Sequence, residues 1–418
     1  MHGPNNRIRT IDIIFAVATA ALAACGPSAG QPEFADADRA AWVIVGSDVA
    51  SAVTRFLEPT NSESRVVATQ NDRVILSVRE GEIDGLAGFF HDTFRRCGGF
   101  TAHSTLTDAT AALTDAAPDP SLVASEPPLV AAAPDVVNQL IPLVSASQIV
   151  STINNLTSFG TRHYRSNGGV QAANWLRSRW ATLAQGRAGA TATLFQHSAW
   201  PQPSVLLTIP GDESPGEVVV IGGHLDSINS QGTTNSSAPG ADDDASGVAT
   251  LTEVARLILS QNIRLRRTVT FMAYAGEEAG LRGSSAIARD YRARNVPVVG
   301  VMQLDMTNFD GSPHDIVLIT DNVSATQTDF LATLAARYVP QFPVSRDRCG
   351  YACSDHASWT RAGYPAVLPF EATLTTHNPN IHTANDTLSV SGNNANHAAK
   401  FAKLAIAYVV EMAQVPAN

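Results

Sequence analysis

Between residues 136 and 418 the chain alternates β-branched apolar runs with helix-like segments, and this alternation restricts the architectures open to it. The clearest run, Val218 to Ile221, ends in two glycines and has the continuous apolar character of a parallel strand buried on both faces. Further strands are expected at 191–196, 205–209, 268–274, 298–304, 316–319 and 366–370, and helices at 168–183, 246–260, 284–294, 324–338 and 395–413. We therefore expect an α/β fold: a three-layer domain over 136–418, with a mixed, mostly parallel central sheet flanked by helices.

The residues before 136 divide into two further parts. Residues 26–104 read as a small α/β segment, with strands near 42–45 and 73–78 and an amphipathic helix near 82–95. Residues 105–135 are rich in Ala, Thr, Asp and Pro, which indicates an extended linker. Linkers of this kind are natural cleavage sites, so a processing site is expected here.

The first 25 residues have the pattern of an export signal. Arg7 and Arg9 precede a mostly apolar stretch over 11–24, which is too short to span a bilayer and ends in small residues. The sequence Leu22-Ala23-Ala24-Cys25 also resembles the bacterial lipobox, in which the cysteine carries a lipid; an ordinary secretory signal is the alternative. We expect an exported protein, secreted to the medium or the periplasm, or an outer-membrane lipoprotein before processing if Cys25 is lipidated. Any membrane contact would be through that lipid.

Composition excludes several classes of protein. With 28 Lys and Arg against 38 Asp and Glu, the net charge is −10, which argues against a nucleic-acid partner. Four cysteines in 418 residues exclude a disulfide scaffold and a Cys-rich zinc fold. No apolar run reaches the roughly 18 residues that a membrane-spanning helix requires.

Histidines and carboxylates recur where the expected strands end. His224 and Asp226 follow the strand that ends at Ile221, and Asp305 ends the strand near 298–304. Other such residues follow the strand near 268–274, precede the helix near 246–260, or lie in a turn-like segment: Glu277, Glu278, Asp242, Asp243, Asp244 and His382. Singly, such residues are usually surface groups or helix caps. Their convergence at the carboxyl ends of strands, where α/β sheets bind ligands, indicates a site.

The residue types at this edge suit metal-assisted hydrolysis. Two histidines and three carboxylates form a hard-to-borderline ligand set of the kind that zinc prefers. Two adjacent carboxylates, Glu277 and Glu278, allow one to bind metal while the other serves as a general base.

Seven stretches carry a resemblance to a known family. The chain resembles the secreted bacterial leucyl aminopeptidases of the co-catalytic dizinc exopeptidases, metallopeptidase clan MH. The motifs occur in the family's order over about 136–415: GGHLDS (222–227), APGADDDASG (238–247), FMAYAGEEAGLRGS (271–284), QLDMTN (303–308), CGYACSDHASW (349–359), AGYPAVLPFE (362–371) and NPNIHTANDT (378–387).

The resemblance implies two zinc ions per catalytic domain. Asp243 would bridge them, with Glu278 and His382 completing one site and His224 and Asp305 the other. A water held by both ions would attack the peptide carbonyl, and one ion could hold the free α-amine of the substrate. The implied partners are therefore peptides with a free N-terminus.

The resemblance also assigns roles beside the metals. Glu277 would be the general base, and Asp226 would orient the imidazole of His224. A cis peptide would fall at Asp243-Asp244. Cys349 and Cys353 would form a disulfide; a C-x-x-x-C zinc site is the competing interpretation of this pair.

An apolar substrate pocket is implied as well. Its walls would be Met306, Ile319, Tyr351, Leu368, Phe370 and Ile381, with the two cysteines, and it would favour Leu, Met or Phe as the N-terminal residue. Leu374 and His377 depart from the aromatics that related enzymes often carry there.

The function expected is a secreted, monomeric zinc aminopeptidase made as a precursor. The segment before residue 136, including Arg96 and Cys97, resembles the propeptide of these enzymes and would assist folding and block the cleft; a permanent accessory domain is the alternative. A glutaminyl-cyclase-like enzyme or another dizinc exopeptidase of the same fold, and a non-catalytic binding protein, are the other functions considered.

Overall fold

The computed structural model describes residues 37–57, 65–94, 96, 98–113 and 132–416. The predicted export signal with Cys25, the residue Cys97 and most of the predicted linker lie outside these ranges. Residues from Phe34 to Asn418 form one compact unit.

The larger part of the chain, from residue 132 on, is built on a six-stranded mixed sheet. Its strand order is β12 (Ala366–Val367), β9 (Val298–Gln303), β7 (Ser214–His224), β8 (Arg267–Tyr274), β6 (Ser204–Ile209) and β5 (Thr191–Phe195). The first four strands are parallel, and the last two extend the sheet in antiparallel fashion. The expected mixed, mostly parallel sheet is confirmed, and its parallel strands have their carboxyl ends at one edge.

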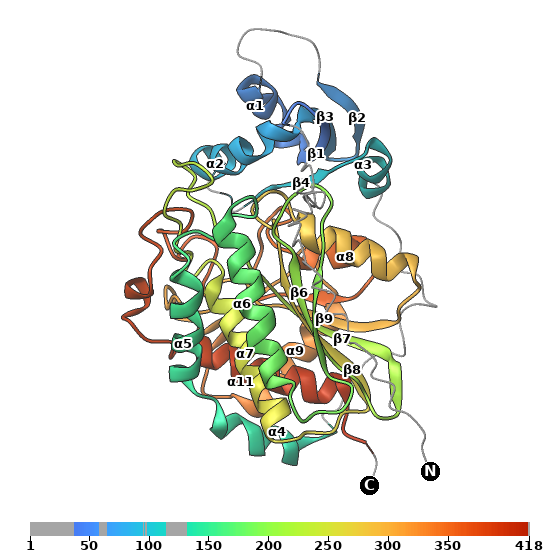
Figure 1. The fold of residues 1–418 in the computed structure, drawn as a ribbon, viewed down its shortest axis with the longest axis vertical. Coiled ribbons are helices and arrows are strands. Elements are labelled where there is room, and N and C mark those ends of the chain that lie inside the picture. Colours follow the sequence, from blue (N-terminus) through green and yellow to red (C-terminus); the bar gives the residue numbers. More distant parts are fainter. Residues whose placement is uncertain (1–36, 58–64, 95, 97, 114–131, 417–418) are drawn as a thin grey trace, which may run out of the picture. The chain divides into compact units, whose positions relative to one another are not determined.

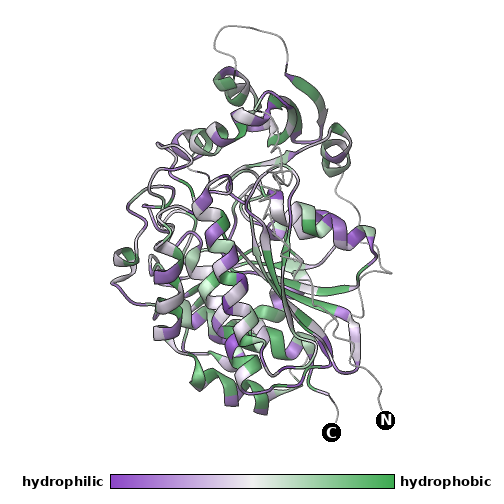
Figure 2. Cartoon of the chain, viewed as in Figure 1, coloured by the Kyte–Doolittle hydropathy of each residue, from purple (hydrophilic) through white to green (hydrophobic). Residues whose placement is uncertain are grey.

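Helices cover both faces of this sheet, as expected for three layers (Figure 1). Alternate residues of β7 point to opposite sides, so that Val219 and Ile221 join one core and Val218 and Val220 the other. The first face is covered by α4 (Pro134–Leu140), α5 (Ala146–Thr157), α6 (Asn167–Leu183), α7 (Ala245–Ser260), α9 (Ala325–Tyr338) and α11 (Ala398–Ala413). The second is covered by α8 (Arg282–Ala293) and α10 (His356–Arg361). Figure 2 shows the central strands in the colours of hydrophobic residues and hydrophilic stretches on α6 and α8.

One predicted strand is divided between two sheets. The expected strand at 366–370 is instead two short strands, of which β12 pairs with β9 and β13 (Pro369–Phe370) pairs with β10 (Ile316–Ile319). Together β13, β10 and β11 (Val344–Asp347) form a separate three-stranded sheet. The prediction of one strand was wrong because a chain that leaves one sheet for another keeps its apolar character throughout.

Residues Ala40–Leu113 form what we call the N-terminal subdomain. Its antiparallel sheet has the order β2 (Val66–Gln70), β3 (Arg73–Arg79), β1 (Ala40–Gly46) and β4 (Phe100–His103). On one face lie α1 (Ser47–Leu57) and α2 (Ile83–Phe94), where Val53, Leu86 and Phe90 pack on Val43. A 3-10 turn, Glu80–Glu82, joins β3 to α2.

The other face is covered by a helix that lies in the range predicted as linker. This helix, α3 (Leu106–Leu113), buries Ala109 and Leu113 against Ile44 and Ile75. The predicted boundary at residue 104 therefore ends the subdomain too early. The chain is described again from Ala132, whose amide donates to the buried carboxylate of Glu411.

Two further 3-10 turns lie at Ile141–Leu143 and Leu388–Ser391. In the described ranges no single helix combines the length and apolarity of a membrane span; only the pair Pro134–Leu143 and Ala146–Thr157, bent by 64°, does so jointly.

Candidate metal centre and active site

The predicted metal ligands come together at the carboxyl edge of the parallel strands. His224 is the last residue of β7, Asp305 lies two residues beyond β9, and Glu278 follows β8. Asp243 precedes α7, and His382 is in the loop between β13 and α11. This edge is where parallel sheets bind ligands, and the strands hold the side chains in place.

Asp243 lies between two pairs of ligands. The Nε2 atom of His224 is 2.8 Å from Asp243 Oδ1 and 3.6 Å from Asp305 Oδ1. On the other side, Nε2 of His382 is 3.2 Å from Asp243 Oδ2 and 2.8 Å from Glu278 Oε2. In each group of three residues the ligand atoms lie within 4.8 Å of one another. The two groups share Asp243, as a bridging carboxylate would require.

The residues of this cluster fit a pair of divalent cations. All five side chains are buried, with at most 3% exposure. Within the described residues, both carboxylate oxygens of Glu277 and the Oδ1 atom of Asp305 are buried and accept no hydrogen bond. Buried carboxylates without donors are costly unless a cation neutralises them. The two imidazoles and three carboxylates are the ligand types that zinc takes.

Burial and crowding of charge govern the protonation of the cluster. Burial raises the pKa of Glu277 well above its usual value, and Glu278 and Asp305 add to the effect. Burial likewise raises the pKa of Glu278 to about 7. Burial lowers the pKa of His224, but Asp305, Asp226 and Asp243 outweigh it and raise that pKa well above the usual value. A bound cation would stabilise the ionised form of these clustered carboxylates.

Asp226 supports both the imidazole and the carboxylate pair. His224 Nδ1 donates to the backbone oxygen of Asp226 at 3.2 Å, while the Asp226 carboxylate lies 3.6 Å from the ring. The carboxylate oxygens instead accept from the amides of Glu277 and Glu278 at 3.0 and 3.2 Å. Asp226 therefore positions the predicted base as well as the predicted ligand.

Asp244 caps α7, which agrees with the interpretation of such acidic residues as helix caps. Its side chain also links three segments of the chain. Its side chain accepts from Gly247 at the start of α7, from the amide of His224 at 2.9 Å and from the amide of Met306 at 3.1 Å. The peptide bond Asp243-Asp244 is cis, which confirms the expectation.

Sequence reasoning missed three further residues around the ligands. Asp386 accepts from the amide of Asp243 at 3.0 Å, and Asn378 donates to Asp386 at 3.1 Å. Ser354 donates to Asp305 Oδ2. Ser354, Asn378 and Asp386 lie inside the motif stretches 349–359 and 378–387, so their position in those motifs was the only signal available.

An apolar cavity opens beside Asp305. Four of the six predicted pocket residues line it: Met306, Tyr351, Leu368 and Phe370. Cys349, Cys353, Ser354, Leu374 and His377 line it as well. Ile319 and Ile381 belong to the same apolar cluster but do not line this cavity; Ile381 instead lines a neighbouring cavity with Leu374 and His377. The disulfide between Cys349 and Cys353 is present, with an S–S distance of 2.04 Å, and confirms the predicted pairing.

The N-terminal subdomain lies against this site. The ring of His91 in α2 is 4.9 Å from that of His382, and the guanidinium of Arg96 is 5.2 Å from the ring of Tyr351. A methyl group placed on Gly98 would lie 3.9 Å from Oε1 of Glu277. The segment after α2 therefore contacts a wall of the apolar cavity and passes close to the predicted base.

The fold and the buried cluster together define a metal-dependent hydrolase. The model of peptidase family M28 matches residues 204–409. The leucine aminopeptidase 1 of Arthroderma gypseum is 38% identical over 294 residues, covering 67% of this chain and 77% of that protein. The chain belongs to peptidase family M28, and it is a metallo-aminopeptidase. The predicted family of leucyl aminopeptidases is therefore confirmed, whereas bacterial origin, secretion and the number of zinc ions stay predictions.

Two solved structures extend the similarity to the N-terminal subdomain. The aminopeptidase LapA of Legionella pneumophila superposes with a TM-score of 0.77 at 27% identity, covering 90% of this chain and 99% of that one. LapB of the same organism gives 0.76 at 31% identity, with the same coverage. Because residues 136–418 are only about two-thirds of the chain, this coverage must include part of the N-terminal subdomain.

Proposed function

We propose that the enzyme removes apolar N-terminal residues, leucine among them, from peptides with a free amino terminus, and that it does so with two zinc ions. The observation that carries the proposal is the pair of ligand groups that share Asp243 beside an apolar cavity. The leucine aminopeptidases to which the chain is similar support the choice of substrate.

The metals and the protein would divide the chemistry between them. Bound at His224, Asp305, Asp243, Glu278 and His382, zinc would act as a Lewis acid that polarises the scissile carbonyl and acidifies water. The chain's own carboxylate, Glu277, would do the proton transfers.

Glu277 is suited to that role by burial and by position. Its side chain is 0% exposed, and Asp226 holds its backbone amide. Glu277 accepts one proton from water as the water oxygen bonds to the carbonyl carbon. It then returns this proton to the amide nitrogen as the carbon–nitrogen bond breaks, so that the peptide leaves as an amine and Glu277 is regenerated.

The substrate's first side chain would occupy the apolar cavity. Met306, Leu368 and Phe370 form an apolar wall next to Asp305, so binding would remove an apolar side chain from water. Leu374 and His377 border the same space and would adjust the preference among Leu, Met and Phe.

Hydrolysis of leucine p-nitroanilide by the catalytic fragment, separated from the N-terminal subdomain after proteolysis, tests this function. We expect turnover that stops on chelation and returns when zinc is added. Zinc-loaded protein that is inactive on every aminoacyl substrate would contradict the proposal, and protein that only cyclises N-terminal glutamine would favour the cyclase alternative.

We further propose that the chain is exported as a latent precursor and that the N-terminal subdomain is its propeptide. The contacts of His91 and Arg96 with the site, and the position of Gly98 close to Glu277, support this role. Residues 114–131 contain no Lys or Arg, so an elastase-type protease, rather than trypsin, is the tool that would cut them. Activity that is already full before any cut would contradict latency.

A further inference from the structure

The N-terminal subdomain contributes a buried carboxylate to the catalytic domain. Glu80, which follows β3, is 2% exposed. It accepts hydrogen bonds from Nη1 of Arg282 at 2.6 Å and from Nη2 of Arg165 at 2.7 Å. Arg282 is itself 2% exposed, so this ion pair between the two parts of the chain is removed from water.

A second acidic residue of the subdomain meets the same surface. The hydroxyl of Tyr164 donates to Asp84 at 2.5 Å, and Nε of Arg165 donates to that hydroxyl at 2.7 Å. The guanidinium of Arg282 also lies 4.5 Å from the ring of Trp200, within the range of a cation–π contact. We call Tyr164, Arg165, Trp200 and Arg282 the docking patch.

The docking patch has its acidic partners in the subdomain. Among the residues that the structure describes, the carboxylates paired with Arg165 and Arg282 are Glu80 and Asp84. Without the subdomain, the two arginines would stand side by side with no carboxylate partner from the described catalytic domain. Two adjacent guanidinium groups bounded by aromatic rings form a surface suited to an acidic polypeptide.

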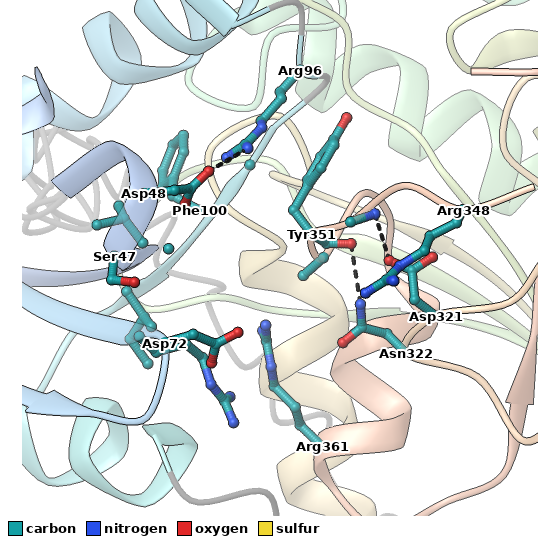
Figure 3. A pocket seen from close by; sticks show the side chains of 17 residues that line it. Ser47, Asp48, Asp72, Arg96, Phe100, Asp321, Asn322, Arg348, Tyr351 and Arg361 are labelled. Atoms are coloured by element: carbon teal, nitrogen blue, oxygen red, sulfur yellow. Dashed lines mark hydrogen bonds and ion pairs between the residues drawn. The ribbon is translucent and has the colours of Figure 1, made fainter. Parts of the chain in front are cut away.

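Another part of the interface is less closely packed. On the side of Tyr351 the two parts enclose a cavity of about 420 Å³, with charged residues on both walls (Figure 3). There Arg96 pairs with Asp48 of its own subdomain, and Arg348 and Arg361 project from the catalytic domain. The ion pairs of the docking patch are therefore close polar contacts across an interface that leaves a cavity on the side of Tyr351.

The docking patch is continuous with the segment that carries the predicted base. The amide of Arg282 donates to the backbone oxygen of Gly276 at 3.0 Å, which closes the turn containing Glu277. The amide of Ala102 in β4 donates to Gly280 in that turn, also at 3.0 Å. The subdomain therefore contacts the turn that contains Glu277 in two places, at Gly280 and at the side chain of Arg282.

We propose that the docking patch retains the N-terminal subdomain after the chain is cut between residues 113 and 132. Cutting the linker then yields an inactive noncovalent complex, and activity appears only when the pairing of Glu80 is broken or the subdomain is destroyed. The proposal rests on the proposed latency and names the contact that maintains it.

The test uses the full-length, zinc-loaded chain cut by an elastase-type protease. We expect the two fragments of the wild type to co-elute in size-exclusion chromatography and to hydrolyse leucine p-nitroanilide poorly. In Glu80→Gln the fragments should separate, with a dissociation constant at least about 100-fold higher, because the buried Arg282 loses its carboxylate partner and the partly exposed Arg165 keeps only Asp84. The released catalytic fragment is identical to that of the wild type, so its activity should be the same.

A matched control is two residues away. Glu82 is paired only with Arg65 and Arg79 of the subdomain among the described residues, so Glu82→Gln should leave the fragments together. If Glu80→Gln fails to fold, Asp84→Asn, which removes the acceptor of the Tyr164 hydroxyl, takes its place with a smaller increase.

Two results would overturn the proposal: wild-type fragments that separate and become active on cutting, or Glu80→Gln fragments that stay together and inactive. Co-elution does not depend on turnover. A catalytic fragment that separates as expected but never hydrolyses any substrate would therefore contradict the proposed function and leave the docking patch supported.

Discussion

The carboxylate of Asp226 accepts a hydrogen bond from the amide of Glu277 at 3.0 Å, and thereby joins the end of β7 to the turn after β8. Its other oxygen accepts from the amide of Glu278 at 3.2 Å. One buried side chain thus fixes the predicted base and a predicted ligand together.

Replacing Asp226 with Ala should therefore lower kcat about 10- to 100-fold and weaken zinc binding, as loss of an outer support of a metal site usually does. Asn, which keeps one acceptor oxygen, should cost less. Steady-state kinetics and zinc content measure both effects. The control is Asp212→Ala, which removes a partly exposed partner of Arg264. Wild-type kcat and zinc content in Asp226→Ala would show that the turn needs no such support.

Glu277→Gln should separate proton transfer from metal binding. The substitution keeps the shape of the side chain but removes its basicity, so we expect kcat to fall by about 10²–10⁴-fold. Zinc content should stay unchanged because Glu277 is not in either ligand group. Glu213→Gln, which alters an exposed pair with Arg266, is the control. Near-normal turnover with normal zinc would assign the base elsewhere.

The number of zinc ions that each variant binds should show whether both metal sites share Asp243. Asp305→Ala and Glu278→Ala should each lower the zinc content from two ions to one, whereas Asp243→Ala should lose both. Elemental analysis after equilibrium dialysis measures this.

A third acidic group provides the control for the metal count. Asp310, Asp315 and His397 also lie within ligand distance of one another, but Lys400 pairs with Asp315 and supplies the positive charge there. Asp310→Ala should therefore keep two ions. A loss of one ion in that variant would place a zinc site away from the strand ends.

Loss of the disulfide should weaken substrate binding more than it destabilises the fold. Cys349 and Cys353 close a loop of only five residues that carries Tyr351, so the chain-entropy estimate of its contribution to stability is about 2 kcal/mol. In the double Ser variant we expect KM for leucine p-nitroanilide to rise several-fold while zinc content is retained. An alanine substrate, which fills less of the cavity, should be affected less. Equal changes for both substrates would argue against a role in the cavity.

Local sequence was enough to bring three predicted ligands to one edge of the sheet, but not to find every residue that supports them. His224, Asp305 and Glu278 could be placed because each follows an apolar strand, and parallel strands bring their carboxyl ends to one edge. The hydrogen bond from the amide of Asp243 to Asp386 joins residues 143 positions apart and has no periodic signal.

Composition led to one incorrect expectation for a related reason, namely that the range of α3 is an extended linker. The segment holding α3 has the Ala-, Thr- and Asp-rich character of a linker, and only the burial of Ala109 and Leu113 reveals a packed helix. The docking patch is equally invisible in the sequence, since Glu80 and Arg282 are 202 residues apart.

Acid should weaken the docking of the N-terminal subdomain through Glu80. Burial alone would raise the pKa of Glu80, but Arg282 and Arg165 outweigh it and hold this pKa below its usual value in the docked state. Asp84, Tyr164 and His163, whose Nε2 lies 4.0 Å from Asp84, are the other titratable groups that face Glu80 and its arginines at this contact. A carboxylate with a lowered pKa contributes its full stabilisation above its ordinary value near 4.5, and loses it as the pH falls through the lower value.

The dissociation constant of the cut complex should therefore be flat near neutral pH and rise below about pH 4.5, by up to tenfold per pH unit for one proton. Size-exclusion chromatography at each pH measures this rise, which should be absent in Glu80→Gln. Glu82→Gln should keep this rise. Burial would raise the pKa of Glu82, but Arg65 and Arg79 outweigh it and lower this pKa to about 2. Because both arginines belong to the subdomain, this pairing is the same whether the subdomain is docked or free. The same rise in Glu80→Gln as in the wild type would assign the acid sensitivity to another group.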